Sequence, residues 1–218
     1  MTTCSPKFSN KIESLTGDKI SDNFIKAIGG EKKLKEVKTM VMIAVVQTQG
    51  IEFELESYRK APDKMVLTMK SNQGTMTRIL NGEKAVVITS NGNEPITGND
   101  LKALQEEATI FPELYRKKFG HKLEYLGIEK VNERDMYKVK LFLPNGNSRL
   151  KFYDKETDLL KKVIDEEGRE LFYNEYNEVK GVRTPHLNKM ISPTGILKFK
   201  ITEVKINPVL ENEMFEIK

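Results

Sequence analysis

Few side chains in this 218-residue sequence have types and spacings that could do chemistry, and the two histidines come first. His121 and His186 lie far apart, and neither belongs to a His-x-x-Glu-His or Cys-x-x-Cys pattern of the kind that binds zinc. His121 follows Gly120, where we expect a helix to end and where a cation suits the helix dipole. His186 stands between Pro185 and a predicted strand. We therefore predict no catalytic or metal-ligating role for either histidine.

Acidic residues recur at a regular spacing in the segment that contains Glu52, Glu54 and Glu56. These three could act as paired carboxylates, but Phe53 and Leu55 stand between them. Alternation of apolar and charged residues is typical of a β-strand with one face buried and one in water. We interpret the glutamates as the solvated face of a strand.

A second acidic segment begins like a calcium-binding loop. Asp154, Glu156 and Asp158 alternate, but Leu159 occupies the sixth position, where that loop needs glycine. Asp165 occupies the twelfth position, where the loop uses a bidentate glutamate. The pattern therefore favours an acidic turn between two strands.

Other catalytic patterns are absent from the sequence. It has no Gly-x-Ser-x-Gly nucleophile elbow, and Gly29-Gly30 lacks the later Gly-Lys-Ser/Thr of a phosphate-binding loop. We predict that the protein is not an enzyme and uses no cofactor or metal. A small hydrolase with a site spread over several strands is the weakest of the alternatives that we consider.

The composition limits the classes of partner that this protein is expected to bind. An apolar fraction of 38% and a charged fraction of 31% are typical of a globular protein. The net charge of +4 is spread evenly, which argues against a nucleic-acid partner. No apolar run reaches the ~18 residues of a transmembrane helix, and we recognise no export signal. The single cysteine, Cys4, cannot form an internal disulfide.

The longest regular pattern runs from Thr39 to Ser90 and predicts a series of antiparallel strands. Apolar residues alternate with polar ones along it, and turn-forming residues interrupt it. The turns are Gln49-Gly50, Ala61-Pro62-Asp63, Asn72-Gln73-Gly74 and Asn81-Gly82. One face of such a sheet needs an apolar cover.

Two helical segments could supply that cover. The first is Ser21–Lys35, interrupted at Gly29-Gly30 and continued by a short turn over Glu31–Glu36. The second lies within Ile96–Gly120, where Asn99 can cap a helix and Pro112 can open another after a break. Residues 1–17 are polar and are interpreted as a flexible N-terminal tether, followed by a single domain at residues 18–218.

A second β series follows the broken helix and completes the predicted fold. It extends from Lys122 to Ile217, and a shift in apolar phase near Thr202–Glu203 predicts a β-bulge. We expect roughly ten or eleven strands, joined by short turns and therefore antiparallel. The fold class is α+β: an open, strongly curved antiparallel sheet, or incomplete barrel, with helices across its concave apolar face.

This order of elements resembles the LolA/LolB-like lipoprotein-carrier fold of bacterial envelopes. Tyr58–Lys64 resembles that family's strand-ending aromatic–basic–proline segment, and Leu80–Val87 resembles its Asn-Gly hairpin. Ile96–Leu114 matches the position of its lid helices. Ser21–Thr39 and Val179–Pro185 resemble a subgroup that also occurs behind insulinase-type zinc proteases.

The chain also departs from the family at two positions. Ala61 stands where lipoprotein carriers have an arginine that holds the lid shut, with Arg59 and Lys60 nearby. Ala85 or Val86 replaces the hairpin tryptophan. The resemblance implies a periplasmic location, or the periplasmic face of the outer membrane. It also implies lipid or lipoprotein acyl chains as partners, together with an envelope protein.

The apolar residues of the broken helix and of the first β series form the predicted binding site. Methionine adapts to ligands of varied shape, which favours a binding cavity, although an ordinary core has about equal weight on composition alone. The predicted cavity residues are Val45, Phe53, Leu55, Leu67, Met69, Met76, Ile88, Leu101, Leu104, Phe111 and Leu114.

We expect this cavity to bind acyl chains or another apolar ligand without catalysis. The alternative is a protein-interaction module, associated with an envelope protease, whose concave face is filled by its own helix.

Overall fold

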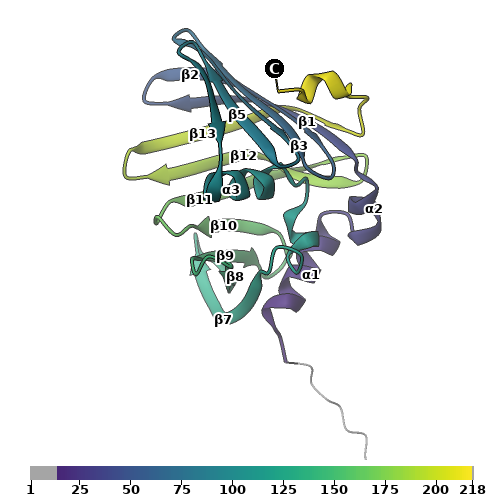
Figure 1. The fold of residues 1–218 in the computed structure, drawn as a ribbon. Helices are drawn as coiled ribbons and strands as arrows, with labels where there is room; N and C mark the ends of the chain where they lie inside the picture. The colour runs from purple at the N-terminus through teal and green to yellow at the C-terminus, as the bar shows by residue number, and fades with distance from the viewer. Residues whose placement is uncertain (1–13, 218) are drawn as a thin grey trace, which may run out of the picture.

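A single antiparallel sheet of 13 strands dominates the computed structural model, which describes residues 14–217. Figure 1 shows the sheet curving around α3 and α1 without closing into a barrel. The predicted fold class is therefore confirmed, although the strand number is higher than expected. Cys4 and most of the predicted tether lie outside the described residues.

The sheet consists of two meanders that meet at one pair of strands. Its order is β6-β5-β4-β3-β2-β1-β13-β12-β11-β10-β9-β8-β7, so β1 and β13 join the two halves. The first meander contains β1 (Thr39–Thr48), β2 (Ile51–Lys60), β3 (Lys64–Ser71), β4 (Gly74–Asn81), β5 (Lys84–Thr89) and β6 (Gly92–Ile96). The second contains β7 (Lys122–Val131), β8 (Arg134–Phe142), β9 (Ser148–Asp154), β10 (Leu160–Ile164), β11 (Glu170–Val179), β12 (Val182–Ser192) and β13 (Gly195–Ile206).

The helices lie on both faces of this sheet. α1 (Gly17–Ala27), α2 (Glu31–Glu36), α3 (Gly98–Ala108) and the 3₁₀ helix η1 (Pro112–Tyr115) cover one face, which we call the inner face. The 3₁₀ helix η2 (Asn212–Phe215) covers the other, or outer, face. Phe215 is completely buried there and packs with Val66, Ile79 and Val86.

The helix α1 forms because its sequence supplies a cap, an apolar side and a stop. The Thr16 side chain accepts a hydrogen bond from the Lys19 amide at 3.2 Å, which caps the N-terminus. Ile20 and Phe24, one turn apart, are buried, and the Phe24 ring lies 5.6 Å from the Tyr153 ring of β9. Gly29 ends the helix with φ +139 and approaches the backbone of Gly181 too closely for a side chain.

The structure differs from the predicted elements in three places. β6 was not expected, since Pro95 is unusual in a strand, but an edge strand tolerates proline. The segment predicted as a final strand, Met214–Ile217, contains the end of η2. α3 begins at Gly98 after the N-cap residue Thr97, so Asn99 is not its cap, and the helix predicted to begin at Pro112 is only the four-residue η1.

The predicted β-bulge is confirmed. Ile43 of β1 pairs with Glu203 of β13, but Ala44 pairs with Ile201, so Thr202 is the extra residue. The bulge returns apolar side chains to the inner face on both sides of it, which explains the phase shift in the sequence.

The close approach of α1 to β7 yields a test of the fold. A Cβ atom on Gly17 would lie 2.9 Å from the Cβ of Leu123 and 3.0 Å from its carbonyl carbon. We predict that Gly17→Ala lowers the free energy of unfolding by about 1–3 kcal/mol through overpacking, although alanine favours helices. Urea denaturation measures the change. Lys19→Ala, at an exposed position of the same helix, is the control and should be neutral or slightly stabilising; equal stability of both variants would contradict the packing described.

Candidate functional site

The helix α3 lies across the inner face of the first meander and packs on an apolar floor. Leu104 and Ala108 of α3 are buried against Met65 and Leu80, both of which have no exposed surface. The Gln105 side-chain amide also donates a hydrogen bond to the Gly82 carbonyl at 3.0 Å. The floor is therefore closed beneath α3, and nothing can enter there unless the helix moves.

Seven of the predicted cavity residues lie on the inner face or on α3, and four of them, Leu55, Leu67, Leu101 and Leu104, meet at this contact. Cross-strand pairing of Leu55 with Ala44 and Met69, and of Met69 with Met76, places them on one face of the sheet. The residues that share the inner face or face it from α3 are Phe53, Leu55, Leu67, Met69, Met76, Leu101 and Leu104. Of the five from the sheet, only Leu67 is fully buried; the other four are half-buried.

Two predicted cavity residues lie on the outer face instead. Val45 pairs with Glu54, whose side chain is exposed to water, and Ile88 packs against the outer cluster that contains Phe215. The sequence could not settle the orientation of Val45, because β1 is apolar at both alternations. The outer face also has an apolar cluster, which is why Ile88 can lie there although it is apolar.

Phe111 and Leu114 are on the inner side of the sheet but belong to a different contact. Because α3 ends at Ala108, the chain turns away before Phe111, and both residues pack in the larger core formed with α1. Pro112 opens η1, as the sequence predicted.

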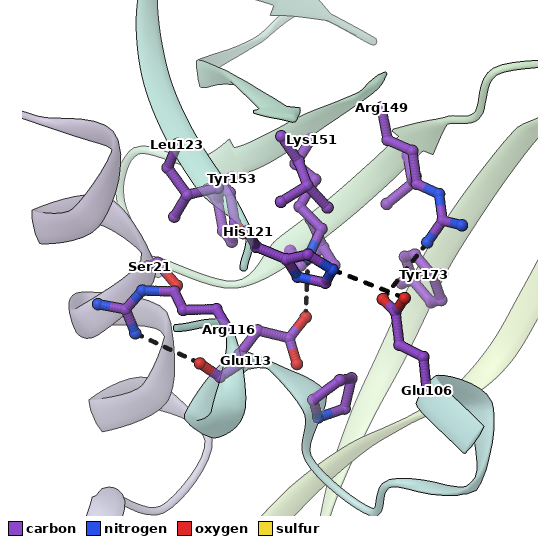
Figure 2. A pocket seen from close by; sticks show the side chains of 14 residues that line it. Ser21, Glu106, Glu113, Arg116, His121, Leu123, Arg149, Lys151, Tyr153 and Tyr173 are labelled. Carbon is purple, nitrogen blue, oxygen red and sulfur yellow. Dashed lines mark hydrogen bonds and ion pairs between the residues drawn. The ribbon is translucent and has the colours of Figure 1, made fainter. Parts of the chain in front are cut away.

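A small polar cavity lies between α1, the α3–η1 segment and the strands of the second meander (Figure 2). Its volume is about 180 Å³, below the ~300 Å³ at the lower end of small-molecule sites. Charged side chains line it on two sides, over an apolar base that includes Leu141, Leu160 and Val163. This cavity has room for a polar group, although not for a long acyl chain.

The most buried ion pair of the cavity joins Glu113 of η1 to Lys151 of β9. The carboxylate oxygen Oε1 and the ammonium nitrogen Nζ are 2.9 Å apart, and both side chains are about 15% exposed, at 15% and 14%. Burial opposes ionisation of Glu113, but the charge and hydrogen bond of Lys151 outweigh it and lower the pKa of the carboxyl. Burial likewise opposes the charge of Lys151, and Glu113 outweighs it and raises the lysine pKa. Each group is charged because the other is present.

Glu106 of α3 makes the second contact across the cavity. Its carboxylate lies 3.6 Å from the His121 ring nitrogen Nε2 and 3.6 Å from Arg149 Nη1, and Arg149 also pairs with Glu166 at 3.1 Å. Burial raises the pKa of Glu106, but hydrogen bonding and charge from His121, followed by the charge of Arg149, lower it further than burial raises it. Figure 2 shows the Glu106 carboxylate pointing toward both partners.

A third basic group ties the end of η1 to α1. Arg116 donates hydrogen bonds to Asp18 at 3.0 Å and to Asp22 at 2.8 Å. The α3–η1 segment is therefore attached to the rest of the protein by ion pairs at its end and by an apolar row in its middle.

Buried polar atoms without partners are concentrated on the inner face. Within residues 14–217 four such side-chain atoms occur, on Ser57, Arg59, Tyr153 and Asn188. Ser57 pairs across strands with Met42 and Leu67, Arg59 with Met40 and Met65, and Asn188 with Phe199, all within the inner face. Tyr153 is 1% exposed and is one of the residues that line the polar cavity. A buried polar atom without a partner is uncommon and unfavourable. The buried side-chain atoms of the described residues that lack a hydrogen-bond partner therefore lie on the inner face.

Sequence reasoning nominated none of the polar cavity residues. Arg149, Lys151 and Tyr153 do stand at alternate positions, which places them on one face of β9. A charged alternation is ordinarily the solvated face of a strand, as it is for Glu52 and Glu54, so this signal was ambiguous without the structure.

The described residues contain no metal site or membrane-spanning helix. Within 14–217, no three His, Cys, Asp or Glu side chains are grouped so that they could hold a metal ion. No helix in the same range is long and apolar enough to cross a membrane.

The sequence matches no family model and no curated protein, but the fold has solved counterparts. A DUF1329 family protein from Desulfovibrio piger superposes with a TM-score of 0.64 at 13% identity, over 92% of this chain and 97% of the other. A LolA superfamily protein from Nitrosomonas europaea gives 0.63 at 11% identity, over 94% and 99%. A domain from Vibrio parahaemolyticus, named for outer membrane lipoprotein sorting, gives 0.62 at 12%, over 91% and 95%. The chain therefore has the LolA/LolB-like fold.

The Glu113–Lys151 pair gives a stability prediction. Lys151→Met leaves a carboxylate buried without its partner, and we expect the free energy of unfolding to fall by about 3–5 kcal/mol. The double variant Lys151→Met/Glu113→Leu buries no charge at this place and should recover most of the loss. Thermal and urea denaturation measure both. A double variant no more stable than the single one would contradict the pairing.

The same pair also predicts how the stability of the protein depends on pH. Because the pKa of Glu113 is lowered from its ordinary 4.5, its stabilisation is complete above that pH and is lost as the pH falls through the lowered value. The wild type should therefore lose stability below about pH 4.5 more steeply than the double variant.

Proposed function

We propose that this protein binds acyl chains, or a similar apolar ligand, on the inner face of its sheet and carries them without catalysis. The observation that carries the proposal is the strip of half-buried apolar side chains on the inner face. It includes Phe53, Leu55, Met69, Met76 and Phe199, which neither α1 nor α3 covers completely. Such a strip is the expected floor of an apolar binding site.

The helix α3, with η1 behind it, is the proposed lid of this site. Displacing both would expose Leu101, Leu104, Ala108 and Phe111, at a cost on the order of 8 kcal/mol. A fourteen-carbon chain gains roughly 0.8 kcal/mol per buried CH₂, on the order of 10 kcal/mol before entropic costs. The apolar gain is therefore of the same size as the cost of opening the lid.

A non-enzymatic role agrees with the arrangement of the polar cavity. Ser21 and His121 both line it, but no hydrogen bond joins them in the described part of the chain, and His121 faces Glu106 instead. A nucleophile and its base would have to be within hydrogen-bonding distance.

The cell envelope is the proposed location. The likeness to a LolA superfamily protein and to a lipoprotein-sorting domain supports the periplasm, or the periplasmic face of the outer membrane. Lipid or lipoprotein acyl chains, with an envelope protein that delivers or receives them, are the proposed partners.

One observation favours a second candidate function, a protein-interaction module. Met65 and Leu80 have no exposed surface beneath α3, so the helix already fills that part of the floor. If α3 never leaves, the sheet is a scaffold and the outer surfaces are what a partner recognises. The two experiments below separate these functions.

The first prediction concerns two adjacent residues of β4 on opposite faces. Met76→Glu places a charge on the apolar floor and should reduce binding of a fluorescent fatty acid by at least about tenfold, since burying an unpaired charge is unfavourable. Thr75→Glu, on the outer face and paired with Lys70, should leave binding unchanged. Fluorescence titration measures both. Equal effects of the two variants would contradict ligand binding on the inner face.

The second prediction tests movement of the lid. In a Cys4→Ser background, Glu106→Cys and Arg149→Cys replace two side chains that face each other at 3.6 Å. A short bifunctional methanethiosulfonate forms a disulfide with each cysteine, with a sulfinate as the leaving group, and should join α3 to β9 and abolish fatty-acid uptake. Reduction of the two disulfides should restore uptake. Uptake that survives cross-linking would show that α3 is not the lid. Absence of uptake in every sample, the wild type included, would favour the interaction module.

A further inference from the structure

Carboxylates on one side of the polar cavity face basic groups on the other. The lid supplies Glu106 from α3 and Glu113 from η1, together with Arg116 at the end of η1, which is already paired with Asp18 and Asp22 of α1. The sheet supplies the basic groups, Arg149 and Lys151 from β9 and His121 just before β7. In the closed protein each carboxylate neutralises a basic group of the opposite side.

Movement of the lid would break this neutralisation. Both carboxylates leave together, because Glu106 and Glu113 belong to one continuous segment. Arg149 keeps Glu166 at 3.1 Å, whereas Lys151 has no ion pair in the described residues other than Glu113. Lys151 lines the cavity and is 14% exposed with the lid in place. When Glu113 leaves, the ammonium group loses its partner, and an anion that takes the place of Glu113 restores a charge-assisted hydrogen bond that water replaces only in part.

Tyr153 adds a donor that the closed form does not use. Its hydroxyl is buried without a hydrogen-bond partner and lies on the same face of β9 as Lys151. A carboxylate or phosphate oxygen could accept hydrogen bonds from the phenol and from the ammonium group at once. The cavity of about 180 Å³ suits such a head group but not an acyl chain.

A row of inner-face residues connects the cavity to the apolar floor. Tyr173, which lines the cavity, pairs across strands with Asn188, and Asn188 pairs with Phe199. Phe199 pairs with Val46, and Val46 with Phe53. Four strand spacings separate Tyr173 from Phe53, or about 19 Å, so a head group and its tail could lie along one line.

We infer that the ligand is an anionic amphiphile, whose carboxylate or phosphate head group replaces the lid carboxylates beside Lys151 and Tyr153 while its tail lies on the apolar floor. This inference rests on the proposed function and specifies its ligand class. As the lid opens, the carboxylate of Glu113 leaves Lys151 and the head group of the ligand takes its place.

The experiment compares ligands that share a tail and differ in the head group. Affinities for myristate, myristyl phosphate and myristyl alcohol are measured at neutral pH by competition with a fluorescent fatty acid, and inorganic phosphate is added alone as a fourth competitor. The two anions should bind about tenfold or more tightly than the alcohol, as expected for charge-assisted hydrogen bonds. Inorganic phosphate should compete weakly, because it has no tail.

Two variants test the assigned residues, with a matched control. Tyr153→Phe removes a hydroxyl that donates no hydrogen bond in the closed form, so it should change stability little, yet it should reduce the preference for anions over the alcohol. Lys151→Met should reduce the same ratio further. The control is Lys162→Met: Lys162 is also 14% exposed and ion-paired, with Glu170 at 2.6 Å, but it pairs with Phe152 and Phe172 on the outer face. This variant should keep the wild-type ratio.

The outcomes distinguish failure of this inference from failure of the proposed acyl-chain binding. Equal affinity for the anions and the alcohol, or an anion preference that survives both Tyr153→Phe and Lys151→Met, overturns the inference and leaves acyl-chain binding intact. Tight competition by inorganic phosphate alone would overturn the amphiphile in favour of a free anion. Failure of every probe to bind would overturn both proposals.

Discussion

The pairing of β1 with β13 is the interaction on which the rest of the structure depends. These strands come from near the two ends of the chain, and their ladder joins two meanders that otherwise share no strand pair. Without it, α1 and α3 would cover separate small sheets. With it, the two meanders present one curved inner face, and the α3–η1 segment that connects β6 to β7 must cross that face.

Two different forces hold the crossing segment in place, and they act on different halves of the sheet. Apolar burial attaches α3 to the first meander through Leu104 and Ala108, and ion pairs attach Glu106 and Glu113 to the second. An amphiphile can offset both, since its tail replaces apolar contacts and its head group replaces charges. A purely apolar ligand can offset only the first, and would leave Lys151 without an anion.

The outer face of the sheet differs from the inner face in its packing and hydrogen bonding. Phe215 of η2 is completely buried in a small apolar cluster there, and Glu52 and Glu54 of β2 are exposed to water. The buried polar atoms without partners, on Ser57, Arg59, Tyr153 and Asn188, belong to the inner face of the described sheet. This difference between the two faces supports the proposal that a ligand binds at the inner face.

The sequence by itself determined the antiparallel sheet, its turns, the bulge at Thr202 and the broken helix at Pro112, because alternation, turn residues and proline act locally. It also assigned Leu104, Met69 and Met76 to an apolar face, since their neighbours are polar, and the structure has them on the inner face or facing it from α3. It could not orient Val45, whose strand is apolar on both faces, or determine that α3 stops before Phe111. Only the tertiary structure brought Glu113 to Lys151. Whether a buried charge has a partner depends on two segments that meet only after the sheet has curved.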